Sequence, residues 1–276
     1  MESRRRDILR AGLLGIGTAT LAACSPPTTA ASGNATSSAS PSGSASVVRA
    51  PAPSPTAPRT AAPSPPPAPY LSLPGTRHSF DDPRSPWVVV NKRRPLRPLS
   101  FAPADLRHPD VLTSAQGELA LLNSTTADAA EKMFAAASKD GVGMVLGSGY
   151  RSYETQVRLY QSYADTRGTA SADTASARPG FSEHQSGWAF DLEDSDGACA
   201  FLPCFAAQPS AVWAARRAHE FGFIVRYQMD QEHVTGYLAE PWHLRFIGVP
   251  AAMDMHSRGI KNLETYFGLP AAPGYA

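Results

Sequence analysis

The sequence predicts an α+β fold, a single domain with a mostly antiparallel central sheet flanked by helices. Helix and strand patterns follow one another irregularly, without the repeated strand–helix–strand order of an α/β protein. Only about the last 200 of the 276 residues have a globular composition, which suits one domain. Hydrophobic residues make up 42% of the chain, enough for a sizeable core.

Short apolar runs predict the strands of this sheet. The first run, Trp-Val-Val-Val, ends at a turn that contains Asn91 and Pro95. The predicted strands cover residues 87–90, 144–146, 188–192, 223–227 and 238–246.

Apolar residues at helical spacing predict helices over residues 124–138, 153–166, 209–221 and 249–258. Ser124 or Thr125 can cap the first of these helices, and Ser152 can cap the second. The second helix is expected to bury a face formed by Val157, Tyr160 and Tyr163. Small polar residues over 168–179 predict a loop, and the helix over 249–258 is expected to be the last.

The first 24 residues resemble the signal peptide of a bacterial lipoprotein. Four arginines precede an apolar run over residues 11–22, which is shorter than the roughly 20 residues that span a bilayer. Leu21-Ala22-Ala23-Cys24 resembles a lipobox, whose cysteine carries diacylglycerol. Residues 5–10 also resemble a twin-arginine signal, so the Sec and twin-arginine routes both stay open. An ordinary Sec signal, with Cys24 unmodified, is the alternative.

Residues 25–75 predict a disordered linker between this signal and the domain over 76–276. Half of the 26 prolines lie there, among Ser, Ala and Thr, and the only charges are Arg49 and Arg59. Such a segment has too little apolar surface to offset its ordering entropy. If extended, it could span roughly 150 Å. A spacer that lifts the domain off a membrane is one interpretation; an insert of arbitrary length is the other.

The cysteine count fits an exported chain. If Cys24 carries lipid, Cys199 and Cys204 remain as a pair that can form a disulfide in an oxidising compartment. So small a loop would stiffen a local turn. The net charge of +1 gives no argument for nucleic acid as a partner, and none is expected.

Two segments hold candidate metal ligands. His184 lies in a turn seven residues before Asp191, an acid that ends an apolar strand and is costly to bury unless paired. Glu240 and His243 flank Pro241 and Trp242, and an ideal strand would place them on opposite faces. A distortion at Pro241 could bring both to one ion. Each residue alone also fits an ordinary structural role.

Four segments resemble, in order, the motifs of D-alanyl-D-alanine carboxypeptidases of the VanY type. Residues 182–191 match S-x-H-x-x-G-x-A-x-D, and residues 240–243 match E-x-W-H. Residues 148–156 resemble S-G-Y-R-S-x-x-x-Q, and residues 222–227 resemble G-F-x-x-R-Y. The family resemblance implies the D-Ala-D-Ala carboxypeptidase/hedgehog-like fold, with a zinc site on the sheet.

The resemblance also implies roles for individual residues. His184, Asp191 and His243 would bind one Zn²⁺ per chain, and Glu240 would be the general base. Arg151 would stabilise negative charge on the tetrahedral intermediate or hold the substrate carboxylate. The implied substrate-binding residues are Arg151, Gln156, Ser182 and Tyr227.

The resemblance therefore implies a zinc carboxypeptidase that removes terminal D-alanine from peptidoglycan stem peptides. D,D- and L,D-specificity both remain open, and a tether facing the wall suits a polymeric substrate better than free D-Ala-D-Ala. The expected protein is a monomer, lipid-anchored on the outer face of the bacterial cytoplasmic membrane. The rival interpretation is a non-catalytic lipoprotein that binds peptidoglycan or senses zinc; Glu240 argues against it, because binding requires no base.

Overall fold

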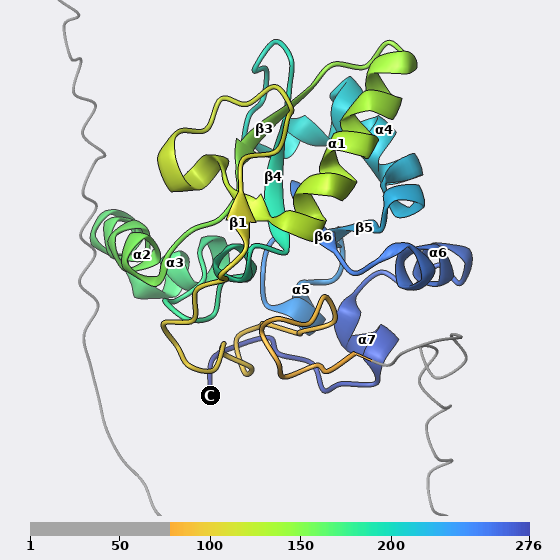
Figure 1. Cartoon of the computed structure of the whole chain (residues 1–276). Coiled ribbons are helices and arrows are strands. Elements are labelled where there is room, and N and C mark those ends of the chain that lie inside the picture. The colour runs from red at the N-terminus through yellow and green to blue at the C-terminus, as the bar shows by residue number, and fades with distance from the viewer. Residues whose placement is uncertain (1–77) are drawn as a thin grey trace, which may run out of the picture. The chain divides into compact units, whose positions relative to one another are not determined.

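The computed structural model describes residues 78–276 (Figure 1). The predicted signal peptide, Cys24 and the linker over 25–75 lie outside the described residues. The α+β prediction is confirmed, because the described chain holds a four-stranded antiparallel sheet in the order β3-β4-β6-β5 and a two-stranded sheet, β1-β2. The strands are β1 (Leu106–Arg107), β2 (Leu122–Asn123), β3 (Met144–Ser148), β4 (Ala189–Asp194), β5 (Phe223–Tyr227) and β6 (Glu240–Phe246).

Helices surround the larger sheet, and short 3-10 turns connect several of them (Figure 1). The α-helices are α1 (Ser124–Lys139), α2 (Tyr153–Arg167), α3 (Thr169–Ala175), α4 (Pro209–Arg217), α5 (Glu232–Thr235), α6 (Val249–Ser257) and α7 (Leu263–Phe267). The 3-10 turns are η2 (Gly117–Ala120), η3 (Glu183–Ser186), η4 (Pro203–Ala207) and η5 (Ala218–Phe221). None of the helices within residues 78–276 has the length and hydropathy needed to cross a bilayer.

Two apolar clusters hold the sheet between them. Helices α1 and α4 pack on the face that carries Phe190, Leu192 and Leu244, where they form the larger cluster. Helices α6 and α7 form the second cluster around Ile224. The alternation of side chains along a strand then places Asp191 on the face opposite Phe190 and Leu192. The functional side chains therefore lie on the face away from α1 and α4.

The prediction of a strand over residues 87–90 is wrong. All four residues are buried, and Val88 and Val90 join the larger cluster while Trp87 and Val89 join the second. This alternation explains the strand-like pattern. The backbone, however, has no neighbouring strand. The carbonyl of Val88 instead accepts a hydrogen bond from the buried guanidinium of Arg245 at 2.8 Å.

Three predictions about the helices are also wrong. The predicted loop over 168–179 contains α3, whose Ala172 is buried; alanine is the strongest helix former. Val157, expected on the buried face of α2, is 40% exposed, whereas Gln156 is the buried residue of that helix. Helix α7 follows the helix that was expected to be the last.

The capping predictions are partly correct. The side chain of Ser152 accepts the backbone N–H of Thr155 and caps α2 as expected. The cap of α1 is Asn123, which accepts the N–H of Thr125, and is neither Ser124 nor Thr125. Asn123 also donates to Asp105, and this bond fixes the start of α1 against the preceding segment.

Candidate metal and catalytic site

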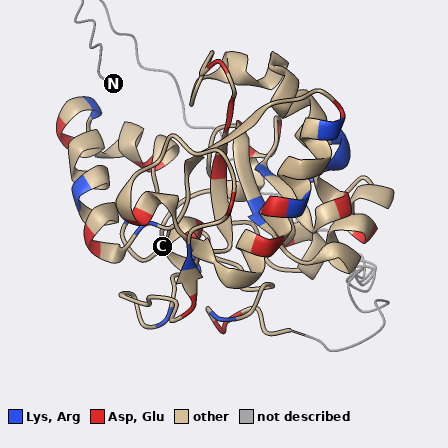
Figure 2. Cartoon of the chain, turned by 45° about the horizontal axis from the view of Figure 1, so that its top comes forward, with Lys and Arg blue, Asp and Glu red and all other residues tan. Residues whose placement is uncertain are grey.

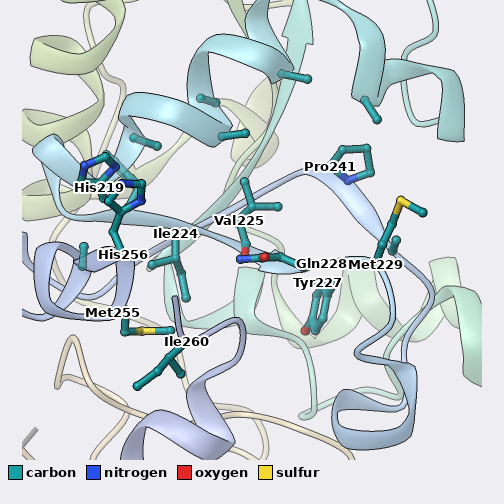
Figure 3. A pocket seen from close by; sticks show the side chains of 18 of the residues that line it. His219, Ile224, Val225, Tyr227, Gln228, Met229, Pro241, Met255, His256 and Ile260 are labelled. Carbon is teal, nitrogen blue, oxygen red and sulfur yellow. The ribbon is translucent and has the colours of Figure 1, made fainter. Parts of the chain in front are cut away.

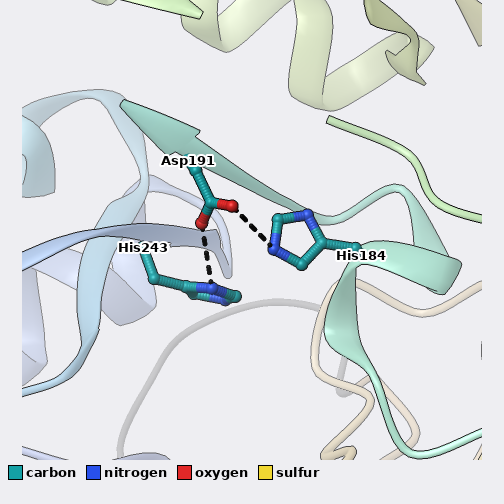
Figure 4. Close-up of side chains that lie close together, drawn as sticks. All are labelled: His184, Asp191 and His243. Carbon is teal, nitrogen blue, oxygen red and sulfur yellow. Dashed lines mark ion pairs between the residues drawn. The ribbon is translucent and has the colours of Figure 1, made fainter. Parts of the chain in front are cut away.

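Three buried side chains from separate elements converge on one point (Figure 4). His184 comes from η3, Asp191 from β4 and His243 from β6, where Asp191 and His243 are directly paired across the two strands. His184 Nε2 lies 3.3 Å from Asp191 Oδ2, and His243 Nδ1 lies 3.3 Å from Asp191 Oδ1. All three ligand atoms lie within 4.8 Å of one another. The structure thus brings together the three residues that the family motifs implied.

His184 presents a lone pair to Asp191. Its Nδ1 lies 2.7 Å from the carbonyl oxygen of Gly149, which can only accept a hydrogen bond, so Nδ1 carries the proton. Burial, together with the nearby Arg151 guanidinium, lowers the pKa of His184. The neutral ring therefore directs an unprotonated Nε2 at a carboxylate, an arrangement that a cation between the two would stabilise.

Asp191 has an unsatisfied oxygen. The residue is only 6% exposed, and its buried Oδ1 has no hydrogen-bond partner. Leaving a buried carboxylate oxygen without a partner is costly. Although burial alone would raise it, the pKa of Asp191 is held below its usual range by the two histidines. Two imidazole nitrogens and one carboxylate oxygen are a donor set that zinc takes in catalytic sites, with a further position left open. The residues present therefore fit a zinc ion.

His243 lies between two glutamates. Its Nε2 is 3.3 Å from Glu183 Oε2, and its Nδ1 is 3.5 Å from Glu240 Oε2. Burial alone would lower the pKa of His243, but its contacts with Asp191 and Glu183 outweigh it and raise the pKa to about 9. Three carboxylates thus surround one imidazole, an arrangement of charge that a cation at this point would stabilise.

A distortion of β6 brings Glu240 to His243. Tyr227 on β5 pairs with Glu240, and Val225 pairs with Leu244, so two steps along β5 correspond to four along β6. The extra residues around Pro241 form a bulge, which puts positions i and i+3 on the same side. The bend on which the sequence interpretation depended is therefore present.

Glu240 is the proton acceptor that the geometry offers. Its side chain is 17% exposed, so it can reach a solvent molecule or a substrate. Burial raises the pKa of Glu240 to about 7 and outweighs the opposing effect of His243. An acid with a pKa near 7 can take up and release a proton at neutral pH, as a general base requires.

Arg151 contacts the same oxygen of Asp191 as His184 does. Its Nη2 is 3.6 Å from Asp191 Oδ2, and its Nη1 donates to Gln156 Oε1 at 2.9 Å. The amide of Gln156 is fully engaged, because Nε2 donates to Ser176 and to the carbonyl of Ala177. Gln156 therefore positions Arg151. A direct contact between Gln156 and the substrate stays a prediction.

The other two predicted substrate-binding residues lie beside the ligands. Ser182 is buried immediately before η3, two positions from His184. The ring of Tyr227 packs against His243 with centroids 4.9 Å apart, and also against Tyr237 at 5.0 Å. Both lie where they could line a substrate site, and their roles stay predictions.

Sequence reasoning missed the charged residues behind the site. Glu183 and Glu264 are wholly buried with Arg226 and Arg245, joined by hydrogen bonds of 2.7–3.1 Å. One signal was available. Arg226 and Arg245 each interrupt an apolar run on a predicted central strand, and a charge there needs a buried partner.

Two further features lie away from the metal ligands. Cys199 and Cys204 form a disulfide, with Cα atoms 5.6 Å apart. An apolar cavity of about 550 Å³ lies along β5 between α4 and α6 (Figure 3), and it touches Tyr227 and Pro241 but none of the three ligands. Acidic and basic residues are intermixed over the elements of the described chain (Figure 2).

Comparisons with known proteins agree with this geometry. The family model described as VanY, D-alanyl-D-alanine carboxypeptidase, matches residues 119–249. The putative carboxypeptidase YodJ of Bacillus subtilis is 35% identical over 191 residues, which cover 68% of this chain and 69% of YodJ.

Two solved structures are similar over most of their length. The LD-carboxypeptidase LdcB superposes with a TM-score of 0.64 at 35% identity, over 67% of this chain and 87% of LdcB. A variant of the vancomycin-resistance D,D-pentapeptidase VanY, in complex with Zn(II), gives a TM-score of 0.55 at 28% identity, over 66% of this chain and 98% of that one.

Proposed function

The chain belongs to the VanY family of D-alanyl-D-alanine carboxypeptidases, and we propose that it removes the C-terminal D-alanine from peptidoglycan stem peptides, as a D,D- or L,D-carboxypeptidase with one zinc ion. The observation that carries this proposal is the buried group of His184, Asp191 and His243 with Glu240 beside it. The zinc complex of the related D,D-pentapeptidase supports the choice of metal.

His184, Asp191 and His243 would hold the ion. Zinc bound there would supply Lewis acidity, which makes water more acidic and the scissile carbonyl more electrophilic. Glu240 is placed to accept the proton of the attacking water and to deliver it to the leaving amine of D-alanine. Its limited exposure and its pKa of about 7 suit both transfers.

Arg151 is the cation on the substrate side of the site. Its guanidinium is held by Asp191 and Gln156, and 14% of its side chain is exposed. A guanidinium forms paired hydrogen bonds with a carboxylate, so Arg151 can hold the C-terminal carboxylate of the substrate. The same group can stabilise the negative charge that develops on the carbonyl oxygen.

The decisive experiment is mass spectrometry of defined muropeptides after incubation with the purified chain. Loss of one D-alanine from a pentapeptide indicates D,D-specificity, and loss from a tetrapeptide indicates L,D-specificity. A chelator should abolish the reaction, and added zinc should restore it. If no D-alanine is released while one zinc stays bound per chain, the protein is instead a peptidoglycan-binding or zinc-sensing lipoprotein.

The resemblance of residues 1–24 to a lipoprotein signal peptide supports a location outside the cytoplasmic membrane. We propose that Cys24 carries a lipid that anchors the chain on the outer face of that membrane, with residues 25–75 spanning toward the wall. Labelling with radioactive palmitate should mark the chain but not the variant Cys24→Ser. Equal labelling of the two would exclude lipidation at Cys24. We expect a monomer, which light scattering of the solubilised chain can test.

A further inference from the structure

We propose that Glu183, held by a buried network of charged residues, fixes which nitrogen of His243 faces the metal and thereby sets the metal affinity of the site. Glu183 is thus a positioning residue, since it acts on the ion through His243. The inference rests on the proposed function in one respect, because it takes His184, Asp191 and His243 as the ligands of a zinc ion.

The two nitrogens of His243 face different carboxylates. Nδ1 points at Asp191 and Nε2 points at Glu183, at 3.3 Å in each case. A metal ion on the Asp191 side of the ring needs the lone pair of Nδ1, and the Glu183 carboxylate then accepts the remaining proton on Nε2. Glu183 therefore supports the orientation in which Nδ1 of His243 faces the metal.

Two arginines stabilise the negative charge on Glu183. Its Oε1 accepts hydrogen bonds from Arg226 Nε and Arg245 Nη1, both at 2.9 Å. Its side chain is 0% exposed, so no water replaces these partners. Two guanidinium groups on one oxygen require an anionic carboxylate and leave Oε2 to face His243.

Both arginines are held by further hydrogen-bond partners. Arg226 also forms a two-point contact with Glu264 of α7, at 2.7 and 3.1 Å. Arg245 donates to the carbonyls of Pro86 and Val88, and its Nε–H donates to the carbonyl of Phe246 in β6. The two acids and two arginines balance in charge, so the buried network is neutral as a whole.

The residues that support this network lie far apart in the chain. Asn91 donates to Glu264 Oε1 at 3.0 Å, and the two residues are 173 positions apart. Both lie outside residues 119–249, the part that the family model matches. The orientation of a ligand in the matched part therefore depends on segments before and after it.

The two ligand histidines are supported differently. His184 donates to the carbonyl of Gly149, a neutral acceptor, whereas His243 faces the Glu183 carboxylate. A carboxylate partner increases the basicity of a metal-bound imidazole more than a carbonyl does, and outer partners of this kind typically change metal affinity 10–100-fold. The contribution of Glu183 should therefore be measurable in zinc binding itself.

The test is the zinc affinity of three full-length variants, measured by competition with a chromogenic chelator. Glu183→Gln should bind zinc about 10–100-fold more weakly than the wild type. Glu264→Gln should show a smaller loss, since it acts through Arg226. The control Glu220→Gln, which breaks an exposed ion pair with Arg217, should keep the wild-type affinity.

A second readout separates positioning from a merely structural role. Imidazole ¹⁵N chemical shifts distinguish protonated from unprotonated ring nitrogens. The zinc-loaded wild type should show a proton on Nε2 of His243 that is hydrogen-bonded to a carboxylate, and Glu264→Gln should shift this signal. This variant removes no contact to a metal ligand, so it serves even if Glu183→Gln does not fold.

Unchanged zinc affinity in folded Glu183→Gln, or, should that variant not fold, an unchanged His243 signal in Glu264→Gln, would overturn the inference. The proposed function fails by a different result, namely a wild-type chain that neither binds zinc nor releases D-alanine. A wild type that does both, with variants that match it, would refute the positioning role alone.

Discussion

Two glutamates approach the same imidazole from opposite sides, and their surroundings differ. Glu183 lies 3.3 Å from one nitrogen of His243, and Glu240 lies 3.5 Å from the other. Glu183 is 0% exposed and contacts two guanidinium groups, whereas Glu240 is 17% exposed and contacts none. One glutamate faces a closed charged interior, and the other faces the open side of the site.

The two carboxyl groups respond oppositely to these surroundings. Burial raises the pKa of Glu240 to about 7. Burial would raise the pKa of Glu183 as well, but Arg226 and Arg245 hold it well below its usual range. The comparison shows that the partner groups, and not burial, decide the role. Glu183 is a permanent anion that orients His243, and Glu240 is able to exchange a proton.

The largest expected effect is a loss of turnover when Glu240, and not Glu183, loses its ability to accept a proton. The variant Glu240→Gln should lose about 10²–10⁴-fold in turnover, because the amide cannot accept the proton. Zinc content and the unfolding midpoint should stay close to the wild type, since Glu240 is not one of the three ligands and the amide keeps the size of the side chain. D-Alanine release, metal analysis and calorimetry check the three parts. Comparable turnover in the variant would exclude Glu240 as the base.

The sequence was sufficient to predict Glu240 and the three ligands, but it did not predict the buried network around Glu183. The three ligands and Glu240 fall within two short motifs, and β4 and β6 bring them together where the apolar runs predicted strands. The bulge at Pro241 was anticipated because proline interrupts a ladder.

The network behind Glu183 depends on contacts that no local pattern encodes. Arg245 and Glu183 are 62 positions apart, and Asn91 and Glu264 are 173 apart. A charge within an apolar strand predicts that a partner exists, but only the packing of η3, β5, β6 and α7 identifies it. For the same reason residues 87–90 resemble a strand, although a side chain of β6 takes the place of a neighbouring strand.

The second prediction removes the other glutamate. Glu183→Ala should lower the free energy of unfolding by about 3–5 kcal/mol, because it leaves Arg226 and Arg245 as uncompensated buried charges. Urea denaturation in the presence of a chelator measures this without a contribution from the metal. The control Glu220→Ala breaks an exposed pair and should change little. A loss no larger than that of the control would show that the network is not a source of stability.

Zinc bound by His184, Asp191 and His243 should stabilise the folded chain. Zinc at about 100 times its dissociation constant should stabilise the folded chain by about 2.7 kcal/mol, since unfolding separates the ligands. For a domain of this size that corresponds to a rise of roughly 5–10 °C in the unfolding midpoint. Calorimetry with zinc and with chelator measures the difference. His184→Ala should abolish it, and a difference that persists in this variant would place the stabilising ion elsewhere.

The smallest expected effect is on the acid side of the stability profile, and it concerns Glu264. Burial would raise the pKa of Glu264, but its contacts with Arg226 outweigh this and lower it. A carboxyl group with a lower pKa in the folded state adds stability above its unfolded pKa of about 4.5 and loses it as the pH falls through the folded value. Stability of the wild type should therefore decrease below about pH 4.5, and Glu264→Gln should decrease less steeply. Urea midpoints between pH 3 and 6 measure both slopes, and parallel slopes would show that Glu264 does not carry its charge into the folded network.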